Sequence, residues 1–198
     1  MIIFDLGGVL IKVPSRLYYR QLSKASRMPE DAVRGIIERY SLEFDSGRMT
    51  LSGFERRVGK ALGIAPGSVG WLSAFESIAS LDTEVAKLAV MLSRSYRISL
   101  LSNVERWRYE YSKEHMLKGI MRIFEHEFLS YKIKSVKPER AIYDYVIKKS
   151  GLRPGEILFI DDLRPNVAAA RSAGMKSVQF KGMKALRLEL KRFGIKTR

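Results

Sequence analysis

Near the amino terminus the chain reads Ile2-Ile3-Phe4-Asp5-Leu6-Gly7-Gly8-Val9-Leu10, an apolar run that stops at an acidic residue followed by two glycines. A short, continuous apolar run bounded by turn residues is typical of a strand that is buried on both faces. The sequence therefore predicts that Asp5 lies at the carboxyl end of a central strand.

Three further apolar runs have the same form. Residues 97–101 run into Ser102-Asn103, residues 157–160 run into Asp161-Asp162, and residues 176–180 form a weaker fourth run. Amphipathic helical patterns separate them, including one that Asp82 can cap. Alternating strands and helices predict an α/β fold, a Rossmann-like parallel sheet with helices packed against it.

Residues 13–81 have a different character, because helical patterns follow one another there and no strand is expected. We expect a small helical-bundle cap domain at 13–81, inserted into an α/β core domain of residues 1–12 and 82–198. The four expected cap helices are Ser15–Ser26, Pro29–Tyr40, Leu51–Leu62 and Pro66–Ala79.

Polar residues follow the carboxyl ends of three expected strands. In open parallel sheets ligands bind at this edge, so Asp5, Ser102, Asp161 and Asp162 could share one crevice. Each also has an ordinary structural role open to it, Asp5 in a turn and the others as helix caps. Their ordered recurrence at strand ends favours a site.

These motifs, in this order, resemble those of the haloacid dehalogenase superfamily. Residues 4–10 resemble its first motif, residues 100–103 its second, Lys137-Pro138 its third, and residues 159–167 its acidic fourth. The resemblance covers essentially the whole chain. It implies a sheet with strand order 5-4-1-2-3 and a cap inserted after the first motif.

The resemblance also implies a role for each matching residue. Asp5 would attack phosphorus and form an aspartyl-phosphate. Ser102 and the backbone N–H of Asn103 would bind the phosphoryl oxygens, while Lys137 would neutralise charge. Mg²⁺ would be held by Asp5, Asp162 and the Gly7 carbonyl, with Asp161 as a ligand or an outer acceptor. Lys132 and Lys134 lie near enough to compete with Lys137, and Asn166 could either bond the metal ligands or cap a helix.

Gly7 departs from the common pattern of the family. Most phosphatases that the chain resembles have a second Asp at this place, which protonates the leaving group and later activates water. General acid–base catalysis is typically worth about 10²–10⁴-fold. We expect the chain to prefer good leaving groups, such as acyl, aryl or anomeric phosphates, unless a group from the cap replaces the missing acid.

The net charge is +15, from 36 Lys and Arg against 21 Asp and Glu. Residues 171–198 contain nine basic residues and one acid, so this segment contributes +8 of the total. A basic segment attracts polyanions such as nucleic acid, but a solvated surface is the favoured interpretation. No apolar run suggests a membrane span, and the absence of cysteine and of a signal-peptide pattern fits the cytoplasm. Oligomeric state is not predicted.

The preferred hypothesis is a Mg²⁺-dependent phosphatase or phosphotransferase acting on a small phosphorylated metabolite. A 2-haloacid dehalogenase is a second enzyme class, in which the Asp attacks carbon without a metal, and the paired acids Asp161-Asp162 count against it. A third hypothesis is a binding or regulatory protein on a catalytically weakened scaffold, which would associate with nucleic acid through the basic segment.

Overall fold

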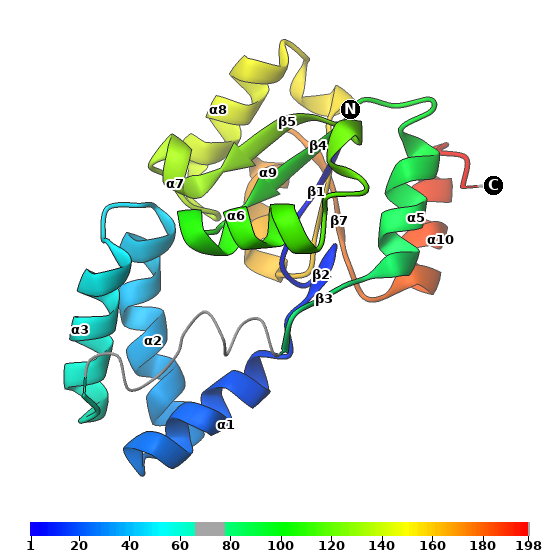
Figure 1. The fold of residues 1–198 in the computed structure, drawn as a ribbon. Helices are drawn as coiled ribbons and strands as arrows, with labels where there is room; N and C mark the ends of the chain where they lie inside the picture. The colour runs from blue at the N-terminus through cyan, green and yellow to red at the C-terminus, as the bar shows by residue number, and fades with distance from the viewer. Residues whose placement is uncertain (66–77, 198) are drawn as a thin grey trace.

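The computed structural model describes residues 1–65 and 78–197. Its central feature is a parallel five-stranded sheet in the order β5-β4-β1-β6-β7 (Figure 1). The strands are β1 (Ile2–Phe4), β4 (Ile98–Ser102), β5 (Phe124–Leu129), β6 (Leu158–Asp161) and β7 (Lys176–Gln179). The sheet contains β1, β4, β5, β6 and β7, which are the first to fifth of its strands in chain order. Read from β7, the sheet therefore has the expected strand order 5-4-1-2-3.

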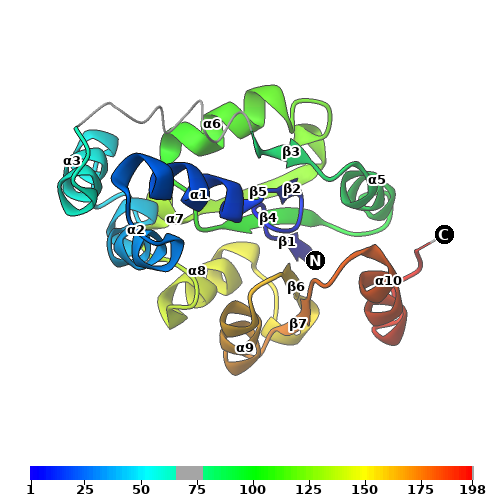
Figure 2. The same ribbon diagram turned by 90° about the horizontal axis from the view of Figure 1, so that it is seen from below.

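Helices cover both faces of this sheet (Figure 2). Successive strand residues point to opposite faces, so Ile2 and Phe4 pack on one side and Ile3 on the other. The first face is covered by α5 (Thr83–Leu92), α6 (Arg106–His115) and α10 (Met183–Arg192), and the second by α8 (Arg140–Ser150) and α9 (Arg164–Ser172). Three short helices, η1 (Met121–Ile123), α7 (Ser130–Ile133) and η2 (Pro154–Glu156), complete the core.

Strand β5 is not among the apolar runs that the sequence shows. It reads Phe-Glu-His-Glu-Phe-Leu, with three polar residues in its middle. An edge strand is hydrogen-bonded on one side only and tolerates such residues, because solvent reaches them. The strand is therefore recognised by its pairing with β4 and not by its composition.

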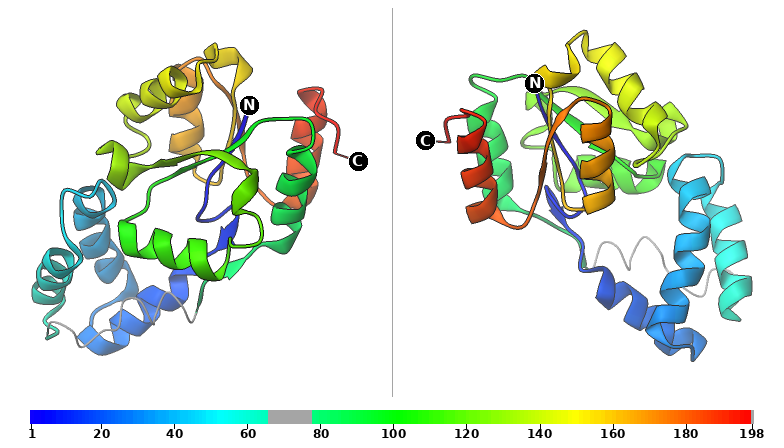
Figure 3. Two further views of the ribbon diagram at one scale, coloured as in Figure 1. Left: turned by 45° about the horizontal axis from the view of Figure 1, so that its top comes forward. Right: turned by 180° about the vertical axis from the view of Figure 1, so that it is seen from behind.

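The helical segment contains α1 (Ser15–Ser26), α2 (Glu30–Asp45) and α3 (Leu51–Leu62), which lie beside the core (Figure 3). They share a hydrophobic cluster of their own, including Leu22, Val33 and Phe54. The bounds of α1 and α3 agree with the prediction. Helix α2 continues five residues past the expected end, because no glycine or proline lies between Tyr40 and Gly47.

Two short segments join the helices to the core. β2 (Ile11–Lys12) and β3 (Ser80–Leu81) pair in an antiparallel two-stranded sheet. The expectation that 13–81 holds no strand is therefore wrong at Ser80–Leu81, since a two-residue pairing leaves no periodic signal. The fourth expected helix, Pro66–Ala79, falls almost wholly outside the described residues, and the domain boundaries at 12/13 and 81/82 stay a prediction. No helix in the described part of the chain is long and apolar enough to span a bilayer.

Candidate active site

Polar side chains from three strands meet at the carboxyl edge of the sheet. Asp5 follows β1, Ser102 ends β4 and Asp161 ends β6, and all three are at most 6% exposed. The Asp5 N–H donates to the Ile160 carbonyl at 2.8 Å, which aligns Asp5 beside Asp161. The parallel register thus brings together residues that are almost 160 positions apart in the chain.

Three carboxyl groups form a compact cluster at this edge. Asp5, Asp161 and Asp162 each offer an oxygen, and these oxygens lie within 4.8 Å of one another. Burial, together with the neighbouring Asp161, raises the pKa of Asp5 to about 8 although Lys137 opposes the shift, and burial and Asp161 also raise the pKa of Asp162. Such a set of hard oxygen donors fits a small divalent cation such as Mg²⁺.

Lys137 lies between two of the carboxylates. Its Nζ is 2.8 Å from Asp5 Oδ1 and 2.7 Å from Asp161 Oδ2, and it also donates to the Leu101 carbonyl at 3.2 Å. Although burial alone would lower the pKa of Lys137, Asp5 and Asp161 raise it above its usual value, so the side chain stays charged. Lys132 and Lys134, which the sequence could not exclude, are exposed.

Asn103 holds the backbone of Lys137 from both sides. The Lys137 N–H donates to Asn103 Oδ1 at 2.7 Å, and Asn103 Nδ2 donates to the Lys137 carbonyl at 2.8 Å. This contact of the side chain was not foreseen, because the sequence suggested a role only for the backbone N–H. The signal that could have found it is the scarcity of Asn, since Asn103 and Asn166 are the only two in the chain.

Asp161 has a full set of hydrogen-bond donors. Asn166 Nδ2 lies 3.0 Å from both of its carboxylate oxygens, and the Leu163 N–H donates to Oδ1 at 2.8 Å. Asn166 makes no side-chain cap at the start of α9. Of its two possible roles, the structure thus shows the one in which Asn166 bonds an acid of the cluster.

The two glycines after Asp5 have different surroundings. At Gly8, φ is +79° and an added Cβ would lie 2.3 Å from Asp162 Oδ2, so only glycine lets the two segments approach this closely. At Gly7, no atom lies within 4 Å of the position a Cβ would take. A side chain could therefore extend from position 7 without a clash at its Cβ.

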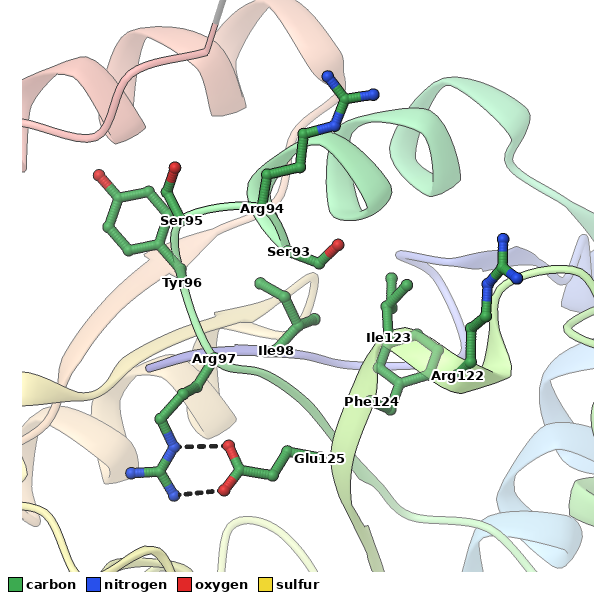
Figure 4. A pocket seen from close by; sticks show the side chains of 10 residues that line it. All are labelled: Ser93, Arg94, Ser95, Tyr96, Arg97, Ile98, Arg122, Ile123, Phe124 and Glu125. Atoms are coloured by element: carbon green, nitrogen blue, oxygen red, sulfur yellow. Dashed lines mark hydrogen bonds and ion pairs between the residues drawn. The ribbon is translucent and has the colours of Figure 1, made fainter.

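A surface pocket, shown in Figure 4, lies at the amino ends of the strands, opposite the edge that carries the acidic cluster. Its lining includes Arg97 and Phe124, which stand at the amino ends of β4 and β5. Arg97 donates two hydrogen bonds to Glu125 there, as the dashed lines show. The acidic cluster lies at the carboxyl ends of these parallel strands. The length of the strands therefore separates the pocket from the cluster, and the pocket is not part of the same site.

The family follows from sequence comparison. A sequence model of haloacid dehalogenase-like hydrolases matches residues 1–174. The chain belongs to the haloacid dehalogenase-like hydrolase family. This hydrolase is similar to D-ribitol-5-phosphate phosphatase of Bacteroides thetaiotaomicron, with 26% identity over 194 residues that cover 90% of each chain. It is also similar to enolase-phosphatase E1 of Aquifex aeolicus, with 43% identity over 65 residues, 33% of this chain and 29% of that protein.

Solved structures agree with this assignment. A family enzyme from Bacteroides thetaiotaomicron, in complex with magnesium and inorganic phosphate, has a TM-score of 0.75 and 25% identity, covering 91% of this hydrolase and 93% of that chain. L-2-haloacid dehalogenase from Xanthobacter autotrophicus has a TM-score of 0.66 and 17% identity, and the match covers 100% of this hydrolase and 83% of that chain. The second likeness shows a shared fold alone.

Proposed function

We propose that this hydrolase is a Mg²⁺-dependent phosphatase of a small phosphorylated metabolite, with Asp5 as the nucleophile. The observation that carries the proposal is how Asp5 is held. Its Oδ1 accepts from the Leu6 N–H at 2.7 Å and contacts Lys137 at 2.8 Å. Among the described residues no hydrogen bond engages Oδ2, so this oxygen remains for attack on phosphorus.

The other residues of the site would divide the remaining work. Asp5 and Asp162, with the Gly7 carbonyl, would hold the cation, and Asp161 would serve as an outer acceptor because its oxygens already take hydrogen bonds from Leu163 and Asn166. When bound, Mg²⁺ supplies positive charge that offsets the phosphate and favours the ionised form of nearby carboxylates.

Ser102 and Lys137 would act on the substrate side. Ser102 ends β4 beside Asn103, where its hydroxyl and the following backbone N–H would hold phosphoryl oxygens. Lys137 is charged and buried, which lets it neutralise Asp5 and the incoming phosphate at once. Attack by Asp5 would give an aspartyl-phosphate, and water would then hydrolyse it.

The substrate class is proposed from the chemistry and from the relatives. One relative acts on D-ribitol 5-phosphate, as its name states, which makes sugar-alcohol phosphates the first candidates. Location in the cytoplasm, where such metabolites occur, stays part of the proposal.

A substrate screen tests the proposal. We expect phosphate release from at least one of a panel of sugar, sugar-alcohol, nucleotide and acyl phosphates with Mg²⁺, and loss of that release with EDTA or in the Asp5→Asn variant. Halide release from a 2-haloacid, measured in parallel, covers the dehalogenase alternative. If halide is released in EDTA and no phosphate ester is cleaved, the proposal is wrong.

One observation favours a second candidate function, binding of polyanions. The carboxyl-terminal residues line a surface groove of about 750 Å³ whose charged members are all basic: Lys184, Arg187, Lys191 and Lys196. Phosphate backbones bind such grooves with an affinity that falls steeply with salt. A salt-dependent gel shift of DNA or RNA, removed by charge reversal at Lys184 and Lys191, would support it.

A further inference from the structure

Helix α5 has a second apolar face that does not pack against the sheet. Its packed face consists of Val85, Leu88, Ala89 and Leu92, which belong to the main hydrophobic cluster. Positions 83, 86, 87, 90 and 91 follow the spacing i, i+3, i+4, i+7 and i+8, so they share the opposite face of the helix. On this face Val90 and Met91 are only half-buried. Part of their apolar surface is therefore left for another partner.

This second face of α5 lines a surface pocket of about 380 Å³, here called the α5 pocket. Leu81 of β3 and Ile120, which directly precedes η1, complete its apolar lining of Leu81, Ala86, Val90, Met91 and Ile120. A pocket of this size, with a mostly apolar lining and a few polar groups, is typical of a site for a small organic molecule. The α5 pocket can therefore hold the apolar body of such a molecule.

The charged residues of the α5 pocket are both basic. They are Lys87 and Arg94, and no ion pair engages either side chain in the part of the chain that the structure describes. Arg94 also lines the pocket of Figure 4, together with Arg122. In that view the side chains of Arg94 and Arg122 extend away from the Arg97–Glu125 ion pair. The two pockets therefore adjoin at Arg94, whose charge is available to both.

Arginines without an ion pair beside an apolar pocket favour an anionic head group. A guanidinium group donates hydrogen bonds in a fixed fork that matches a carboxylate or a phosphate. Ser95 and Tyr96, which also line the pocket of Figure 4, add hydroxyl donors. Charge complementarity thus indicates a ligand with an apolar body and an anionic head.

We propose that the two adjoining pockets form a binding site for a small amphipathic organic anion. Its apolar body would lie against Val90, Met91 and Ile120, and its head group would meet Arg94 and Arg122. The acidic cluster lies outside both pockets, so this anion and a phosphorylated substrate would bind at separate places. The site does not depend on whether the hydrolase is a phosphatase.

Titration of three probes, followed by amide NMR of the ¹⁵N-labelled protein, tests the site. 4-Phenylbutyrate has an aromatic body and a carboxylate, 4-phenylbutan-1-ol has the same body without the charge, and acetate has the charge without the body. We expect 4-phenylbutyrate to bind with a dissociation constant of about 1 mM or below, with shift changes concentrated on α5, Ile120 and Arg122. The alcohol and acetate should each bind at least about five-fold more weakly.

Substitutions at the head and at the body of the site give a second test. Arg94→Gln should weaken the binding of 4-phenylbutyrate by at least about five-fold, since it removes a charged hydrogen-bond donor. Val90→Phe, which places a larger side chain in the α5 pocket, should weaken it by at least as much. Both variants should keep the amide spectrum of the folded protein.

Arg56→Gln is the matched control for the loss of charge. Arg56 is exposed on α3, lines neither pocket and forms no ion pair within the described residues. The variant makes the same change of side chain and of net charge as Arg94→Gln, and it should bind 4-phenylbutyrate as the unaltered protein does. An equal loss of binding in both variants would show that only the overall charge attracts the probe, and the proposed site would be wrong.

Three other results would overturn the proposal. Equal binding of 4-phenylbutyrate and the alcohol would show that the arginines do not recognise the charge. Shift changes centred on Asp5 and Asp162, and removed by Mg²⁺ with inorganic phosphate, would place the probe in the crevice instead. If a second copy of the chain covers this face, sedimentation will show a dimer and the probe will not bind. Each of these results leaves the proposed function intact, because phosphate release is measured without the probe.

Discussion

At the scale of single residues, Lys137 is buried and bonded to three oxygen atoms of the site. It is 3% exposed and bonds Asp5, Asp161 and the Leu101 carbonyl. Removing one partner of a buried ion pair leaves an uncompensated buried charge and costs about 3–5 kcal/mol. Lys137→Met should therefore lower the free energy of unfolding by about this amount in EDTA.

Urea unfolding measures this difference. Lys132→Met is the matched control, since Lys132 is exposed and surface substitutions change stability by less than about 0.5 kcal/mol. Equal urea midpoints for the two variants would show that Lys137 does not balance the carboxylates.

Gly7 gives the second prediction at this scale. Since nothing lies within 4 Å of its Cβ position, Gly7→Asp should fold and present a carboxyl group beside Asp5. We expect hydrolysis of alkyl phosphates to become faster, by about 10-fold or more where leaving-group protonation limits the rate. A folded variant that binds Mg²⁺ and shows no gain on a poor leaving group would contradict this.

At the scale of elements, the turn after β1 and the loop after β6 are packed against each other at Gly8. Gly8→Ala would bring a Cβ to 2.3 Å from Asp162 Oδ2, so the Asp162 carboxylate must move. We expect the affinity for Mg²⁺, measured by calorimetric titration, to fall by at least about 10-fold, since ligand geometry sets the affinity for this ion.

Gly151→Ala is the control for backbone strain. Gly151 has φ +68°, close to the +79° of Gly8, but no atom lies within 4 Å of its Cβ position. A left-handed alanine costs about 1–2 kcal/mol, so this variant should lose stability and keep its Mg²⁺ affinity. Loss of Mg²⁺ binding in both variants would point to general unfolding instead of displacement of Asp162.

Sequence patterns predict some strands of this fold and miss others. The buried strands β1, β4 and β6 were predicted because their residues are apolar on both faces. Strand β5 and the two-residue strands β2 and β3 lack that signal, and they exist because a neighbouring backbone pairs with them. Pairing between distant segments is a tertiary property and leaves no periodic pattern in a single segment.

At the scale of the whole molecule, the net charge of +15 acts on every anionic substrate. Such a field raises the rate of encounter and is screened by salt, with a Debye length of about 10 Å at 0.1 M. We expect kcat/KM for a phosphorylated substrate to fall several-fold between about 0.02 and 0.3 M NaCl, with kcat nearly constant. A steady-state salt series measures it, and a kcat/KM that does not change would show that the basic surfaces lie too far from the crevice to steer the substrate.

The amino-acid sequence by itself determined the α/β class, the four motifs and their order, and the candidates Asp5, Ser102, Lys137, Asp161 and Asp162. It could do so because buried strands and the polar residues that end them are local patterns. Only the tertiary structure decided that Asn103 holds the Lys137 backbone, and that Asn166 bonds Asp161 instead of capping a helix. The Asn103 contact joins two segments of the chain that no local pattern connects. Asn166 and Asp161 belong to one motif, but the sequence left two roles open for Asn166, because the distance between two side chains is set by how helices and strands pack and cannot be read from a segment alone.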